Sequence, residues 1–244
     1  MIVVAFSGGK DSTALALRMA ELGERIDALL FTATGNELPE LRAHLERVAA
    51  MVCAPIVEPK GPSLDSLITE FAALPNWRQR WCTRMIKIEP CIAYLKAHPG
   101  STLCVGLRAD EEERQGLYGE HATYRYPLRE WGWGVADVLR YCAERGVRVP
   151  RRTDCALCYG QRLHEWYELW RDHPSEWARG VLYEATTGHT FRSAGRDSWP
   201  ASLVELGNRF ASGEVPRGVR AAKSAPMLFG DDDETPEACR VCRF

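Results

Sequence analysis

Short apolar runs alternate with amphipathic stretches through the first half of the chain. Four runs have the length of buried strands, at residues 2–6, 26–31, 54–57 and 102–106. Four stretches place apolar residues at helical spacing, at residues 13–22, 39–51, 64–73 and 85–97. Strands that alternate with helices are typical of βαβ units, in which a parallel sheet carries helices on both faces. The pattern therefore predicts a doubly wound α/β domain.

The pattern changes after residue 120. A last strand is predicted over residues 123–128, and the remaining helical stretches follow at 135–144, 161–171, 175–185 and 201–211. From residue 213 onward the chain is rich in glycine, proline and charged residues. We therefore expect three parts: an α/β domain over residues 1–147, a helical extension over 148–212, and a mobile tail over 213–244.

Composition and charge narrow the classes of function. The chain has 244 residues, of which 45% are hydrophobic and 26% charged, as in ordinary globular proteins. Its net charge of −2 is far from that of proteins that bind nucleic acid through bulk charge, so any nucleic-acid contact must be local. No apolar run reaches the roughly 18 residues of a membrane span, and the first residues do not resemble a signal peptide. We expect a cytoplasmic protein without a membrane partner.

The turn between the first predicted strand and the first predicted helix is the strongest candidate for a binding site. Its glycines let the backbone approach a phosphate group, and the helix behind it adds the positive end of a dipole. A lysine adds a point charge, and two serines add hydroxyl donors. The spacing fits neither a Walker loop nor a dinucleotide-binding fingerprint, and a turn without a ligand is the alternative. The turn reads Ser7-Gly8-Gly9-Lys10-Asp11-Ser12.

Nine cysteines are many for a reducing compartment, and an odd number excludes complete pairing. Cys155 and Cys158 form one C-x-x-C pair, and Cys239 and Cys242 form another. Two such pairs are typical of a zinc site, although the distance between them in the sequence is long for a compact one. Three further cysteines lie within apolar patterns and are expected in the core: Cys53, Cys104 and Cys142.

Basic residues surround Cys82 and precede Cys155. Guanidinium groups pair well with phosphates, so these residues either flank a polyanionic substrate or form a solvated basic face. They are Arg78, Arg80, Arg84 and Lys87 in the first group, and Arg148, Arg151 and Arg152 in the second.

The segment 7–12 resembles the PP-loop of the ATP pyrophosphatases, which cleave ATP between its α and β phosphates. The resemblance implies that this loop holds the phosphates of ATP with Mg²⁺ while the α-phosphorus is attacked. Lys10 and Asp11 are the catalytic residues that it implies within the loop.

Later segments resemble the phosphoadenosine phosphosulfate (PAPS) reductase family, and they follow in the family's order over about residues 1–185. The resemblance implies nucleotide ligands at Gly106, Arg108 and Arg114. It also implies a [4Fe–4S] cluster on Cys82, Cys155 and Cys158, with the fourth ligand left open between Cys91, Cys239 and Cys242, and with zinc as the alternative. The segments are TGNELPE at 34–40, WCT at 81–83, KIEP at 87–90, GLRADE at 106–111, YPL at 126–128, CALC at 155–158, EW at 165–166 and HP at 173–174.

Within this family, the intact Lys10 and Asp11 resemble the members that use ATP, because the sulfonucleotide reductases have a degraded loop. The small subunit of ATP sulfurylase keeps the loop but lacks the cysteine pairs. The chain is therefore most similar to ATP-dependent sulfur-transfer enzymes, such as those of DNA phosphorothioation and tRNA thiolation. This implies adenylylation of an acceptor, followed by displacement of AMP by sulfur held on the cluster or on Cys242.

Two other functions stay open. A sulfonucleotide reductase would attack its substrate with Cys239 or Cys242 and depend on a thioredoxin-like reductant. A non-catalytic nucleotide-sensing module would bind ATP without releasing AMP or pyrophosphate. For the first function the expected partners are ATP, a sulfur donor such as a cysteine desulfurase, and an acceptor that includes nucleic acid among the candidates; a homodimer is also open.

Overall fold

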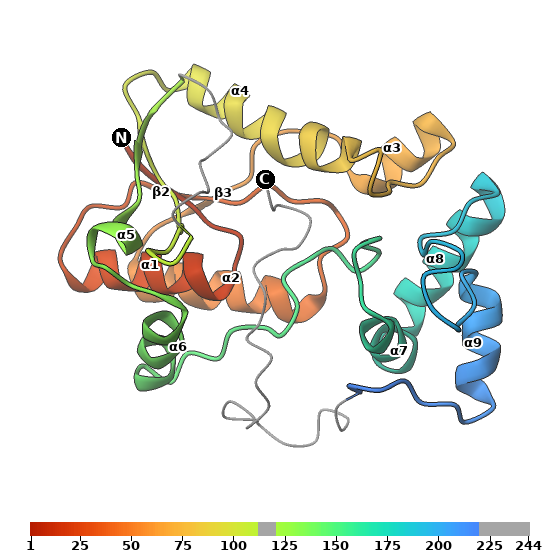
Figure 1. Ribbon diagram of the computed structural model, residues 1–244. Coiled ribbons are helices and arrows are strands. Elements are labelled where there is room, and N and C mark those ends of the chain that lie inside the picture. Colours follow the sequence, from red (N-terminus) through yellow and green to blue (C-terminus); the bar gives the residue numbers. More distant parts are fainter. Residues whose placement is uncertain (112–120, 220–244) are drawn as a thin grey trace.

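The computed structural model describes residues 1–111 and 121–219 (Figure 1). Its centre is a parallel sheet with the strand order β3-β2-β1-β4-β5. Val4 of β1 lies opposite Leu29 of β2 and Cys104 of β4. The strand order reverses between β1 and β4, which is where open α/β sheets bind their ligands. The strands are β1 (Ile2–Ala5), β2 (Ala28–Leu30), β3 (Ile56–Val57), β4 (Thr102–Cys104) and β5 (Thr123–Arg125).

Helices cover both faces of the sheet, as the alternation of apolar runs predicts. On one face α1 (Lys10–Glu21) packs between α2 (Pro39–Val52) and α6 (Val135–Glu144). On the other face lies α4 (Glu89–Ala97) (Figure 1). Val3 and Val4 are both fully buried although successive side chains of a strand point to opposite faces, so both faces are covered.

The chain continues into a helical part built from α7 (Leu163–Asp172), α8 (Pro174–Thr187) and α9 (Leu203–Ala211). Its core contains Trp166 and Leu206, and the same cluster includes Leu67 of α3 (Leu64–Phe71). The helical part therefore shares a core with a helix of the first half. The predicted division at residue 147 stays a prediction.

Three local expectations are wrong. The strand predicted over 123–128 ends at Arg125, because Pro127 lacks an N–H for the sheet and begins the short helix α5 (Pro127–Glu130) instead. The helix predicted over 85–97 begins earlier, as the π-helix η1 (Thr83–Ile88) that continues into α4. Cys53 is exposed rather than buried, since it ends α2 in the left-handed conformation with φ of 51°.

The other two predicted core cysteines, Cys104 and Cys142, are buried. Among residues 1–111 and 121–219, none of the helices combines the length and apolar character that a bilayer crossing requires.

Candidate functional site

The glycine-rich turn lies at the end of β1 and leads directly into α1. Gly9 is the residue before the helix and Lys10 is its first residue. Gly8 has φ of +73°, and a Cβ there would lie 2.5 Å from Cδ1 of Leu41 on α2. Glycine is therefore needed at this position both for the backbone conformation and for the close approach to α2.

The loop after β4 meets this turn where the strand order reverses. A Cβ on Gly106 would lie 3.1 Å from the carbonyl carbon of Asp11 and 3.2 Å from the backbone nitrogen of Ser12. The absence of a side chain thus lets the two loops touch through their backbones. Two of the sequence-predicted nucleotide segments, 7–12 and 106–108, are brought together in this way.

Charged groups converge around Asp11. Nη1 of Arg108 donates to Oδ2 of Asp11 at 2.9 Å, and Nζ of Lys10 lies 3.2 Å from the same oxygen. Arg108 also pairs with Asp110 at 2.8 Å and with Glu111 at 3.6 Å. Burial lowers the pKa of Arg108, but Asp11 and Glu111 outweigh burial, so that the pKa is raised overall. Asp11, Asp110 and Glu111 thus share the guanidinium group of Arg108.

The second carboxylate oxygen of Asp11 indicates what kind of ion the site could bind. Oδ1 of Asp11 is buried, and no donor among the described residues satisfies it. Buried polar atoms in native proteins nearly always have a partner, so an unsatisfied carboxylate oxygen suits a bound cation.

Hydroxyl groups line the turn from two sides. Oγ of Ser7 accepts from the backbone N–H of Gly9 at 3.4 Å and lies 3.3 Å from Oγ of Ser12. From far along the sequence, Oγ1 of Thr153 lies 3.6 Å from the position that a Cβ on Gly9 would take. The segment that leads to Cys155 therefore passes directly over the turn.

Behind the turn, a buried polar pair joins α1 to α2. Oγ1 of Thr13 lies 2.9 Å from Nε2 of His44, and both residues are buried. Burial is the main cause that lowers the pKa of His44 to about 4, and the charge of Arg47 acts in the same direction. His44 is thus neutral at pH 7 and serves to hold the two helices.

The three cysteines predicted to bind a cluster line one cavity. Cys82, Cys155 and Cys158 share its wall with Thr34 and Lys87. The pKa of the Cys82 thiol is raised to about 11, mainly by burial and also by the nearby Cys155, while Lys87 acts in the opposite direction. The π-helix η1, a form that is rare and frequent at functional sites, follows Cys82 directly and carries Lys87.

The described residues do not form a compact site for a single metal ion. In the part of the chain that the structure describes, no three His, Cys, Asp or Glu side chains are grouped so that they could hold a metal ion. Cys91, one candidate for a fourth ligand, packs in the sheet core with Val3 and Leu103 rather than in the cavity. Arg114, Cys239 and Cys242 lie outside the described residues.

The loop of the C-x-x-C pair is held by Asn36, which lies in the loop between β2 and α2. The backbone N–H of Ala156 donates to the carbonyl oxygen of Asn36 at 2.7 Å. The side chain of Asn36 donates to Asp65 at 2.7 Å and accepts from Arg179 of α8 at 2.7 Å. Asn36 thereby joins the cysteine loop, α3 and α8 at the loop after β2.

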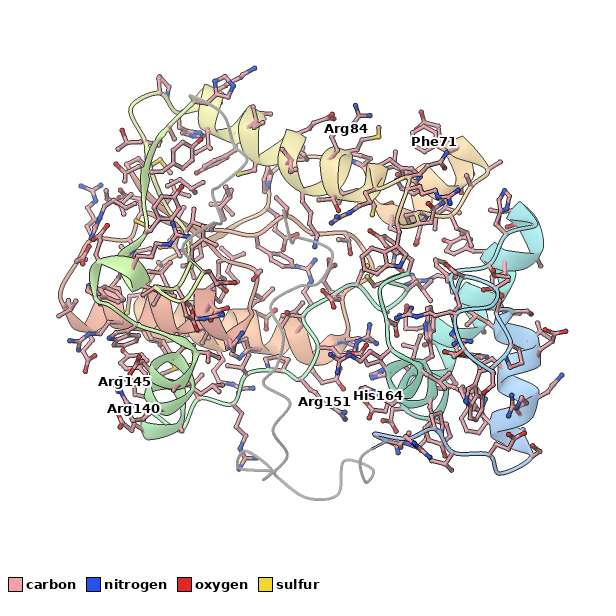
Figure 2. The ribbon with its side chains drawn as sticks, in the orientation of Figure 1. Phe71, Arg84, Arg140, Arg145, Arg151 and His164 are labelled. Carbon is pink, nitrogen blue, oxygen red and sulfur yellow. The ribbon has the colours of Figure 1, made fainter. Side chains whose placement is uncertain are left out.

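Two of the basic residues predicted around Cys82 are exposed. Arg84 projects outward from η1 (Figure 2); 69% of its side chain is exposed, and its Nε lies 3.5 Å from Oε1 of Glu89. Arg78 is also exposed. Nη1 of Arg151 lies 2.6 Å from Oε1 of Glu168, so this carboxylate partly neutralises the charge of Arg151.

Sequence reasoning missed several residues of the site. The acidic residues Asp110 and Glu111 resemble a solvated helix surface in the sequence, but they pair with Arg108. His44 could have been found, since it shares the apolar helical spacing of Leu41 and Leu45. Thr153 carries no local signal, because only the tertiary structure brings it to Gly9.

Comparisons with known proteins show what this chain is similar to. Two relatives, both uncharacterised proteins of Methanocaldococcus jannaschii, are 25% identical over 206 residues and 26% identical over 138 residues. These alignments cover 77% and 53% of this chain but 42% and 33% of the relatives. The chain therefore spans less than half the length of the curated relatives that it matches.

Two solved structures are similar at 20% sequence identity each. One is the PAPS reductase of Candida auris in complex with phosphate, with a TM-score of 0.48 over 61% of this chain and 74% of that chain. The other is a predicted subunit of a tRNA methyltransferase from Methanocaldococcus jannaschii, with a TM-score of 0.34 over 60% of this chain and 89% of that chain.

The family assignment comes from the sequence of the first part of the chain. Residues 1–150, which are more than half of the 244, match the phosphoadenosine phosphosulfate reductase domain. The expected doubly wound α/β fold is confirmed by the parallel sheet and its helices. This protein belongs to the PAPS reductase domain family, within the PP-loop superfamily.

Proposed function

We propose that this protein is an enzyme that adenylylates an acceptor with ATP and then transfers sulfur to the activated position. One observation carries the proposal: Thr153 lies against Gly9 of the loop, and Cys155 follows two residues later. Two residues of extended chain span about 7 Å. A nucleotide held by the loop would therefore lie beside the thiols of the cysteine cavity.

In the first step the loop residues bind the phosphates of ATP. Backbone N–H groups of Gly8 and Gly9 and the hydroxyls of Ser7 and Ser12 would contact phosphate oxygens at the start of α1. An oxygen of the acceptor attacks the α-phosphorus, the bond to the bridging oxygen breaks, and pyrophosphate leaves with the bonding electrons. The charge of Lys10 would stabilise the leaving pyrophosphate.

Asp11 and the loop after β4 complete this site. The buried and unsatisfied Oδ1 of Asp11 fits a Mg²⁺ ion. When bound, the ion neutralises charge on the phosphates. Arg108 is already held beside Asp11, and Gly106 leaves room at the backbone of the loop, so both are proposed nucleotide ligands. Arg114 is proposed with them on its sequence position alone.

The second step needs a sulfur nucleophile, which displaces AMP from the acceptor. Cys82, Cys155 and Cys158 are the proposed ligands of a [4Fe–4S] cluster, and the support for this is that all three line one cavity. A cluster binds each thiolate at a different iron, so it does not require the tight grouping that a single ion needs. When bound, it would supply a soft site that attracts sulfur. Cys239 and Cys242 are the alternative sulfur carriers, or zinc ligands with Cys155 and Cys158.

The donor and acceptor are proposed by their chemistry. A cysteine desulfurase is a natural source of the sulfur. The exposed Arg78 and Arg84 near the cavity favour a polyanionic acceptor, nucleic acid included.

A second candidate is a sulfonucleotide reductase, which the family match supports directly. It would bind an already activated substrate and use a thioredoxin-like reductant. Turnover without free ATP distinguishes it from the sulfur transferase.

The test is formation of AMP and pyrophosphate from ATP by the full chain, purified without oxygen and supplied with sulfide and candidate acceptors. Lys10→Ala should abolish AMP formation without lowering the melting temperature. Lys96→Ala, which removes an exposed lysine at the end of α4, is the matched control and should behave as wild type. Unchanged AMP formation by Lys10→Ala would refute the role of the loop.

A further inference from the structure

The hydroxyl group of Thr153 lies beside the glycine-rich turn and takes no part in the hydrogen bonds of the described fold. Its Oγ1 lies 3.6 Å from the Cβ position of Gly9, and Oγ of Ser7 lies 3.4 Å from the same position. Two hydroxyls thus flank Gly9, one from the loop itself and one from a segment 144 residues away in the sequence. Within residues 1–111 and 121–219, Thr153 has no hydrogen-bond partner, and its side chain is half-buried.

The position of Thr153 is set by contacts on both sides of it. On its C-terminal side, the backbone N–H of Ala156 donates to the carbonyl oxygen of Asn36 at 2.7 Å. Within the segment, Nη2 of Arg152 donates to the carbonyl oxygen of Cys155 at 3.1 Å. On its N-terminal side, Val147 is buried in the core that includes Leu41 and Leu45 of α2, and Val149 packs against the same core. The segment is therefore held over the loop by protein contacts alone, and the hydroxyl is positioned before any ligand binds.

The surroundings select the kind of group that this hydroxyl would bind. The start of α1, the charge of Lys10 and the hydroxyl of Ser7 all favour an anion at Gly9. A hydroxyl is a neutral donor that can turn toward an oxygen of that anion. A donor without a protein partner beside an anion-binding turn is placed to contact an oxygen of that anion.

We propose that Thr153 is a phosphate ligand of the nucleotide site and donates its hydroxyl to the pyrophosphate portion of ATP. This inference rests on the proposed function, since it takes ATP as the ligand. The segment that carries Cys155 then contributes directly to nucleotide binding. Occupation of the loop by the triphosphate consequently stabilises the position of the cysteine loop.

The experiment measures binding of the α,β-methylene analogue of ATP, which cannot be cleaved at the reacting bond, by calorimetry in the presence of Mg²⁺. Thr153→Val keeps the shape of the side chain but removes the hydroxyl, and Thr153→Ser keeps the hydroxyl. Thr186→Val, on an exposed threonine of α8, is the matched control. AMP, which lacks the pyrophosphate portion, serves as the second ligand.

We expect Thr153→Val to weaken binding of the analogue about tenfold or more, since hydrogen bonds to charged groups are worth about 1.5–3 kcal/mol. Its affinity for AMP should stay as in wild type, and Thr153→Ser and Thr186→Val should bind the analogue within about twofold of wild type.

Three results would overturn the inference. They are wild-type affinity in Thr153→Val, an equal loss in Thr153→Ser, and an equal loss of affinity for AMP. Failure of the proposed function has a different signature, because the wild-type protein itself would then not bind the analogue, which would overturn both.

Discussion

Acid should weaken this fold through one buried histidine. His44 is 1% exposed, and its Nε2 lies 2.9 Å from Oγ1 of Thr13. Burial lowers its pKa from the ordinary value of 6.5 to about 4. Between these two values the unfolded chain binds a proton at this residue and the folded chain does not. The free energy of unfolding therefore rises with pH across this window. The contribution of His44 to it is fully present above pH 6.5 and is lost as the pH falls toward 4.

The size of the effect follows from the two pKa values. At about 1.4 kcal/mol per pH unit, the interval from 6.5 to about 4 corresponds to about 3 kcal/mol of unfolding free energy. Burial also lowers the pKa of His164 and His173, so their titration adds to the same trend. The share of His44 is isolated by His44→Gln, which keeps a polar group able to reach Thr13 but does not titrate.

The assay is urea unfolding of wild type and variant, followed by circular dichroism at several values between pH 4 and 8. The stability of wild type relative to His44→Gln should fall by about 3 kcal/mol between pH 7 and pH 4. His189→Gln, at an exposed histidine, is the control and should keep the pH dependence of wild type. Parallel pH curves for wild type and His44→Gln would refute the reasoning.

Two further predictions concern the two halves of the site. Gly106→Ala places a Cβ 3.1 Å from the backbone of Asp11, so the loop must shift. Nucleotide affinity should then fall about tenfold in a calorimetric titration, and the free energy of unfolding should fall by about 1–3 kcal/mol. Wild-type affinity would contradict this prediction. Cys155→Ser should remove most of the iron and acid-labile sulfide from protein purified without oxygen. Cys53→Ser, at an exposed cysteine, should leave both in place. Zinc alone in the wild-type protein would argue against the cluster.

Most of the fold could be predicted from the sequence because it depends on local periodicity. The strands and helices of the α/β part follow from alternating apolar runs, and Pro39 lies in the first turn of α2 as expected. The π-helix could not be predicted, since its hydrogen-bonding pattern has no distinct spacing of apolar residues. Pro127 was a signal for a helix start, but the apolar residues around it resemble a strand.

The site was predicted in part, and the reason is again physical. Segments 7–12 and 106–108 are recognisable because glycine and charge occur at fixed positions, and the three cysteines line one cavity. The contact of Thr153 with Gly9 and the double role of Asn36 depend on packing between distant segments, which no local pattern encodes. The outcome for Arg114, Cys239 and Cys242 stays a prediction, since they lie outside the described residues.

The shared core of α3 and the helical part determines which fragments of this protein could fold by themselves. Helix α3 belongs to the residues that match the family, but its apolar residue Leu67 is buried in one cluster with Trp166 and Leu206, which lie beyond them. A fragment that ends at residue 150 would leave that face of α3 open to water. The family domain is thus not a self-contained module in this chain, and any relative with a different continuation must supply other apolar side chains to cover the same helix.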